Sequence, residues 1–245
     1  MSTYVYAFTG ASHPLPVDSL VGVGERTPPL RLVRHDGLTA VVSDAPERLR
    51  AKRRDVEAHE RVLETLSAAG TVLPMRFGTV AANDEAVKAE LASRAKRYAE
   101  LLKRLKGKVE VNVKAVHREE PVLRELLLGS QELRNRSEAL RASGGGSHQD
   151  KVEFGEQLSA ALDDRRSQDA EQLVAELRPH ASAVKLGPPV DGCFVNVSFL
   201  LGVTEREDFE AALSRLRQER SELMEIGLYG PLPPYSFLTS GEAGD

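Results

Sequence analysis

The chemistry that this sequence could perform depends first on the spacing of its histidine, cysteine and glycine residues. The six histidines are scattered, and no two stand four residues apart, the spacing that lets two imidazoles on one helix hold a metal ion. The glycine patterns of phosphate-binding loops, and of the turn that exposes a nucleophilic serine, are missing as well. The sequence therefore predicts no metal site and no cofactor.

His59 differs from the other histidines in its surroundings. It lies between Val56 and Leu63 on the apolar side of a predicted helix, next to Glu60. A buried imidazole beside a carboxylate can act as an acid or base, but packed histidines more often have a structural role. We therefore predict that His59 belongs to the core, and we keep an enzyme built on His59, Glu60 and Arg76 as an alternative.

Cys193 is the only cysteine, so no internal disulfide can form and a reducing, cytoplasmic location is expected. It opens an apolar segment, and no neighbouring cation or histidine is present to activate the thiol. The sequence therefore predicts an inert core cysteine rather than a nucleophile.

The charge balance argues against nucleic-acid binding, and the hydropathy argues against a membrane-spanning segment. The net charge is −4, and the one strongly basic stretch, residues 47–54, holds five basic residues and one acidic residue. We interpret this stretch as a solvated approach to the next helix. Phe194 is the only aromatic residue on the polar face of its predicted strand, too few for an RNA-stacking platform. No apolar run approaches the ~20 residues that span a bilayer.

The first hundred residues alternate strand and helix patterns. Strands are predicted at 3–8, 30–33, 38–42 and 71–77, with Asp36-Gly37 as a hairpin turn. Helical spacing marks residues 55–69 and a single helix from the cap residue Asn83 to Gly107. We predict an N-terminal α/β domain over residues 1–107.

The remainder predicts a second domain over residues 108–238. Strand patterns cover 108–117, 182–186, 193–203 and 222–229, and Thr204 with Glu207 could form a capping box before a helix. Two antiparallel helices, loosely packed at the tip, are expected in an insertion at about 119–178, on either side of three consecutive glycines. This order predicts a ferredoxin-like split βαβ arrangement with an elongated helical hairpin, an α+β fold of two lobes, and a flexible tail over residues 239–245.

Two segments are more specific than these patterns: TVLPMRFGTV at 71–80 and LYGPLPPYSF at 228–237. Pro74 cannot donate to a strand ladder, so it predicts a sheet edge or a bulge. Arg76 could pair with Glu60 in the interior or present its guanidinium to a partner, and we predict the interior pair. The prolines of the second segment favour an extended exit from the last strand, with Tyr235 and Phe237 anchoring the chain onto the body.

With these two segments, the sequence resembles the gas vesicle protein family GvpL/GvpF from Thr3 to about Leu238. The resemblance implies an accessory protein of gas vesicle formation that contacts the shell-forming protein GvpA and other accessory Gvp proteins. It implies no enzymatic activity and no cofactor. A cytoplasmic protein associated with gas vesicles is therefore expected.

The leading hypothesis is a non-catalytic accessory or minor structural protein of gas vesicle assembly. The alternative is a small-ligand or RNA-binding ferredoxin-like module, because such sheets host many functions. The residues expected to form a structural motif or a partner contact are His59, Glu60, Arg76, Phe77, Tyr235 and Phe237.

Overall fold

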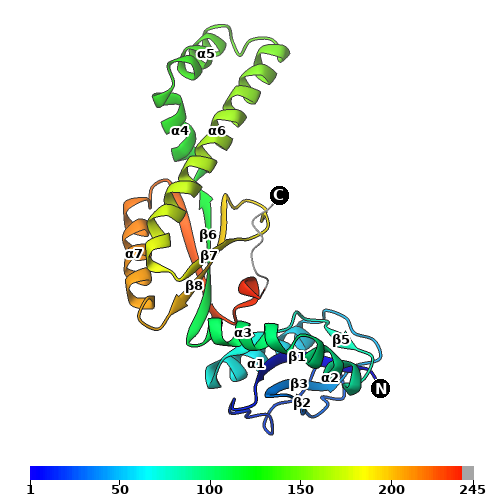
Figure 1. Ribbon diagram of the computed structural model, residues 1–245. Helices are drawn as coiled ribbons and strands as arrows, with labels where there is room; N and C mark the ends of the chain where they lie inside the picture. The colour runs from blue at the N-terminus through cyan, green and yellow to red at the C-terminus, as the bar shows by residue number, and fades with distance from the viewer. Residues whose placement is uncertain (239–245) are drawn as a thin grey trace. The chain divides into compact units, whose positions relative to one another are not determined.

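The computed structural model describes residues 1–238, and the tail predicted at 239–245 lies outside the described residues. The described chain has an α+β fold with two antiparallel sheets and seven α-helices (Figure 1). Contacts divide it into two compact units. The first unit comprises Met1–Val111, Leu200–Val203 and residues 230–238, and the second comprises Asn112–Phe199 and Thr204–Tyr229.

The sheet of the first unit is built around the opening strand. Its strands are β1 (Thr3–Gly10), β2 (Arg31–His35), β3 (Leu38–Asp44), β4 (Val72–Pro74) and β5 (Val80–Ala81). They lie in the order β2-β3-β1-β4, and β5 also pairs with β1. β1 is central and buried along almost its whole length, which explains its apolar and aromatic sequence.

Two predictions for this sheet are confirmed, one of a hairpin turn and one of an edge position. Asp36 and Gly37 both have positive φ, 39° and 76°, as a tight hairpin turn between β2 and β3 requires. Pro74 ends β4, which lies at one end of the strand order, where a missing backbone donor is tolerated.

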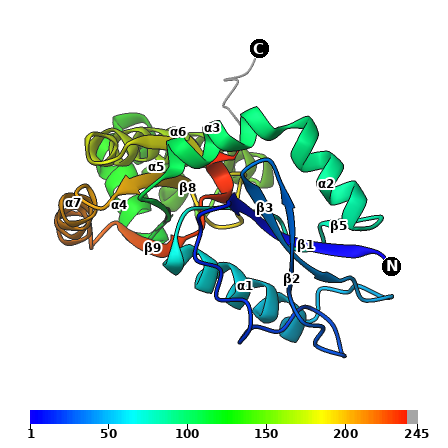
Figure 2. The ribbon, with the colours of Figure 1, turned by 60° about the horizontal axis from the view of Figure 1, so that its bottom comes forward.

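Helices cover both faces of this sheet (Figure 2). On one face, α1 (Arg53–Ala69) packs against Tyr4 and Tyr6 through its buried residues. On the other face lie α2 (Asp84–Ser93) and α3 (Ala95–Leu105). The prediction of one helix here was wrong, because the backbone leaves helical geometry at Arg94 (φ −122°, ψ 19°). The predicted cap is confirmed, since the Asn83 side chain accepts a hydrogen bond from the Ala86 amide.

The second sheet has the strand order β7-β8-β6-β9. Its strands are β6 (Lys108–His117), β7 (Ala183–Leu186), β8 (Val195–Gly202) and β9 (Met224–Leu232). α7 (Arg206–Glu219) packs onto it, with Phe209 against Phe199 at a ring-centroid distance of 5.0 Å. The capping box predicted at Thr204 and Glu207 is not formed, because the helix begins at Arg206, after Glu205 as its cap residue.

The helical insertion contains three helices instead of the predicted two. They are α4 (Glu119–Gly129), α5 (Gln131–Ala142) and α6 (His148–Leu177), and both α4 and α5 lie beside α6 (Figure 1). The break follows Gly129, and the Ser130 side chain accepts from the Leu133 amide to start α5. None of the described helices is both long and apolar enough to span a membrane.

Candidate functional site

Hydrogen bonds with Tyr4 and His59 tie the segment at 71–80 to the core. The Met75 carbonyl can only accept, so His59 Nε2 carries the proton and donates to it over 3.1 Å. His59 Nδ1 therefore accepts from the Tyr4 hydroxyl over 3.0 Å, and the Tyr4 oxygen accepts from the Gly78 amide over 3.1 Å. A chain of three hydrogen bonds thus ties both ends of the turn at 75–78 to the core.

The surroundings of His59 keep its ring neutral. Burial lowers the pKa of His59, and the hydrogen bond to Met75 offsets this only in part. The ring stacks on Tyr6 at a centroid distance of 5.6 Å and meets the edge of Phe77 at 5.7 Å. Burial likewise raises the pKa of Tyr4. Both side chains are therefore neutral hydrogen-bonding groups near pH 7.

Glu60 and Arg76 do not form the interior pair that the sequence predicted. Both side chains are exposed, and no ion pair joins them among the described residues. The reason is the direction of each side chain. α1 buries the face that carries Asp55, His59, Val62, Leu63 and Leu66, which turns Glu60 toward solvent.

The second motif segment packs into the same unit. Ser236 donates from its amide and its hydroxyl to the Glu110 carboxylate, over 2.8 and 2.6 Å, and Glu110 is 3% exposed. The carbonyl of the buried Phe237 accepts from Arg104 over 2.6 Å. The last residues of the described chain are therefore fixed by α3 and by the start of β6.

Tyr235 brings the two motif segments together. It packs against the same hydrophobic cluster as Phe77, the cluster that contains Tyr4, Tyr6 and the buried face of α1. Burial raises the pKa of Tyr235 to about 12, and the nearby carboxylates of Glu60 and Glu110 act in the same direction. Segments far apart in the sequence thus meet around one aromatic core.

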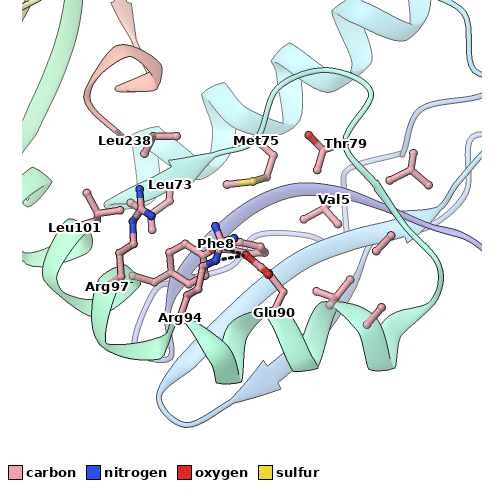
Figure 3. A pocket seen from close by; sticks show the side chains of 15 residues that line it. Val5, Phe8, Leu73, Met75, Thr79, Glu90, Arg94, Arg97, Leu101 and Leu238 are labelled. Carbon is pink, nitrogen blue, oxygen red and sulfur yellow. Dashed lines mark hydrogen bonds and ion pairs between the residues drawn. The ribbon is translucent and has the colours of Figure 1, made fainter. Parts of the chain in front are cut away.

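An open pocket lies on the other face of the sheet (Figure 3). Its volume is about 360 Å³. Apolar side chains of β1, β4 and α3 form much of its wall, and the segment at 71–80 contributes to it. The lining residues from that segment are Leu73, Met75, Thr79 and Val80. Leu238, the residue that follows the second motif segment, also lines the pocket.

Charged side chains of α2 and α3 line the same pocket. Glu90 accepts from the Tyr98 hydroxyl over 2.6 Å and pairs with Arg94 over 3.2 Å. Burial raises the pKa of Tyr98 to about 12, and the hydrogen bond to Glu90 adds to the effect. Arg97 has no ion pair or hydrogen bond to any residue in the described range 1–238 and extends from α3 toward Leu73 (Figure 3).

The sequence does not reveal these pocket residues. Arg94, Arg97 and Tyr98 lie inside the single helix predicted from Asn83 to Gly107, and no sequence pattern shows that this helix breaks at the rim of a pocket. Nor does the sequence reveal a buried group in the second unit, where His117 bonds Asp169 over 2.9 Å and Arg165 bonds the same carboxylate over 2.8 Å.

Two further side chains of the second unit differ in their surroundings from what was expected. Cys193 is half-buried, precedes β8 and lines a second cavity, so it is not a core residue. Phe194 stacks on His117 at a centroid distance of 4.0 Å. Between Met1 and Leu238, no three His, Cys, Asp or Glu side chains are grouped so that they could hold a metal ion.

Comparison with known proteins identifies the fold and its relatives. The sequence model of the family described as "Gas vesicle synthesis protein GvpL/GvpF" matches residues 2–239. The chain is 44% identical over 238 residues to Gas vesicle protein F of Streptomyces sp. (strain CB03234), covering 97% of this chain and 100% of that protein. It is 28% identical to Gas vesicle protein L of the same strain, covering 96% and 91% of the two chains.

A solved structure of a relative shows the same fold. The crystal structure of the gas vesicle protein GvpF from Anabaena sp. PCC7120 superposes with a TM-score of 0.81 at 25% identity, covering 98% of this chain and 99% of that one. The fold is therefore that of a GvpF-like α+β protein, with an aromatic core and an adjoining apolar pocket in its first unit. The chain belongs to the GvpL/GvpF family of gas vesicle synthesis proteins, which implies a role in gas vesicle formation.

Proposed function

We propose that this chain is a non-catalytic accessory protein of gas vesicle assembly that binds the shell-forming protein GvpA and other accessory Gvp proteins. It acts in the cytoplasm in association with gas vesicles. One observation carries the proposal: the two segments most specific to the family converge in the first unit and leave polar groups and an open pocket at its surface. Such a surface is suited to holding another protein.

Within this proposal, the candidate residues divide into two groups. The first group holds the surface in place, because its members are buried or pack against the aromatic core. It consists of His59, Phe77, Tyr235 and Phe237. Arg76 and Glu60 face solvent and are available to a partner. A protruding guanidinium next to a fixed turn favours recognition of a carboxylate or a backbone carbonyl.

The finer architecture is part of the same proposal. The strand order β7-β8-β6-β9, with helices following β6 and β8, supports a ferredoxin-like split βαβ plan elongated by the insertion at 119–178. We propose residues 1–107 and 108–238 as the two domains along the sequence, with the boundary at Gly107, where φ is +69°. Parts of the second range, among them the residues from Gly230 to Leu238, belong to the first compact unit. Limited proteolysis that cuts first near Gly107 would support this boundary, and a first cut inside either range would oppose it.

The test of function is direct binding. The purified chain, captured on a sensor surface, is titrated with GvpA from the same organism, together with the variants Arg76→Ala and Arg61→Ala. Arg61 is an exposed arginine of α1 and serves as the matched control. We expect the wild type and Arg61→Ala to bind alike and Arg76→Ala to bind more weakly at an unchanged melting temperature. No binding by the wild type would contradict the proposed function.

A further inference from the structure

We propose that the pocket between β1, β4 and the α2–α3 pair receives one large apolar side chain of the shell protein, and that Arg97 pairs with a carboxylate beside that side chain. This inference rests on the proposed function and names the chemistry of the contact. The partner segment is therefore an apolar residue with an acidic neighbour. Neither feature follows from membership of the family.

The size and lining of the pocket favour a single side-chain anchor. About 360 Å³ lies at the lower end of the range for ligand pockets, and is enough for one or two large side chains. Val5, Phe8, Leu73 and Leu101 supply apolar wall. Interfaces commonly concentrate their binding energy in one anchor buried in such a pocket.

The mouth of the pocket has the properties of an adaptable contact surface. Met75 is half-buried, and its flexible thioether can adjust to different apolar shapes. Val80 is 46% exposed, so a large apolar side chain already faces solvent at this place. Covering Met75 and Val80 with a partner removes apolar area from water, which favours association.

Charge then selects the partner. Arg94 is neutralised by Glu90, and Glu90 also accepts from Tyr98, so these three groups satisfy one another. Arg97 has no such partner among residues 1–238, although it lines the same pocket. A guanidinium at the edge of an apolar pocket gains most from a carboxylate, which it can bind through two parallel hydrogen bonds. The anchor side chain is therefore expected to lie next to Asp or Glu.

Two variants test the pocket and its charge separately. Ala86→Trp places a large ring at the exposed lining position of α2, and its control Ala89→Trp places the same ring on an exposed position of α2 outside the pocket. Arg97→Glu reverses the unpaired charge, and its control Lys96→Glu makes a similar change one residue earlier, outside the lining. All four chains are first checked for an unchanged melting temperature.

The measurement is the dissociation constant of each full-length chain for GvpA. We expect Ala86→Trp and Arg97→Glu to weaken binding by at least about tenfold, and the two controls to stay within about twofold of the wild type. Equal binding by all five chains would overturn the pocket inference and leave the proposed function standing. No binding by the wild type would overturn both.

A separate measurement distinguishes GvpA from a second copy of this chain as the occupant of the pocket. If the pocket served a second copy of this chain, the wild type would dimerise and Ala86→Trp would shift it to the monomer in light scattering without GvpA. That result would overturn the inference. An unchanged mass in all variants, with GvpA binding lost in the two pocket variants, supports it.

Discussion

At the scale of single residues, the Tyr4 hydroxyl holds the motif turn in place. It accepts from the Gly78 amide and donates to His59 Nδ1, and Tyr4 is fully buried. Tyr4→Phe removes the hydroxyl and leaves both partners without it. Leaving a buried group unsatisfied costs ~1–3 kcal/mol, so we expect a lower free energy of unfolding by about that amount.

Chemical denaturation followed by circular dichroism measures this loss. Tyr229→Phe is the matched control, because Tyr229 is 52% exposed and keeps its ring contact with Lys114 after the change. A loss in Tyr4→Phe no greater than in Tyr229→Phe would contradict the described hydrogen-bond chain.

His59 gives the same network a pH dependence. Burial lowers the pKa of His59 below its ordinary value, so the unfolded chain binds the proton first as the pH falls. The contribution of His59 is constant above about pH 6.5 and is lost progressively below it, down to the folded-state pKa. We expect the free energy of unfolding to fall between pH 7.5 and 5.5, and to fall less in His59→Gln.

His117 acts in the same direction, because burial lowers its pKa as well. The comparison therefore uses wild type, His59→Gln and His117→Gln at both pH values. An identical pH slope in wild type and His59→Gln would show that His59 is not the neutral buried group described.

The sequence placed His59 on the buried face of its helix, because helical spacing identifies that face. It could not place Arg76. A guanidinium next to an aromatic residue is compatible with a buried pair or an exposed contact, and the choice depends on where Glu60 points after α1 has packed. Burial of α1 is a tertiary property, which the local sequence does not contain.

At the scale of elements, the helical insertion starts its longest helix with a capping box. Ser147 accepts from the Asp150 amide, and the Asp150 carboxylate accepts from the Ser147 amide over 2.9 Å. Ser147→Ala removes one half of this box, which costs typically ~1 kcal/mol locally. We expect faster amide hydrogen exchange at residues 148–152 and little change in the overall melting temperature.

Hydrogen exchange with mass spectrometry resolves that region. His148→Ala is the control, since His148 is exposed at the same helix start. Unchanged exchange in Ser147→Ala, or equal acceleration in the control, would show that the box does not hold the helix end.

Predictions of helices, strands and turns succeeded where single residues determine the local structure. They failed where tertiary packing determines it. Local chemistry at single positions predicts the Asp36-Gly37 turn, the Asn83 cap and the edge position of Pro74. The turn and the edge depend on the backbone, and the cap depends on the Asn83 side chain. The breaks at Arg94 and Ser130 interrupt sequences whose apolar spacing continues across them. Such breaks depend on packing that the spacing does not reveal.

At the scale of the whole molecule, Glu110 joins the end of the described chain to its middle. Both its carboxylate oxygens accept from Ser236, and its side chain is buried. Glu110→Gln replaces one acceptor by a donor that faces a donor. We expect a loss of ~1.5–3 kcal/mol, the range for hydrogen bonds to charged groups, and faster amide exchange at residues 235–238.

Glu100→Gln is the control for this change, because Glu100 is an exposed carboxylate of α3. The same stability for Glu110→Gln and Glu100→Gln would contradict the role given to Glu110. The pairing of Glu110 with Ser236 could not be predicted from the sequence, since 126 positions separate the two residues.

The sequence was nonetheless sufficient for the fold class and the family. The α+β class follows from alternating strand and helix patterns, and the family follows from residues 71–80 and 228–237. What it could not give is the meeting of those segments around Tyr235 and the pocket beside them. Both arise only when β1 brings its neighbours together.

The central claim is that GvpA binds the surface formed by the two motif segments. Amide hydrogen exchange of the full chain, measured alone and with saturating GvpA, tests it most directly. We expect protection to concentrate in residues 71–80, 94–101 and 235–238. Protection confined to α4, α5 and α6, with these three ranges unchanged, would contradict the claim.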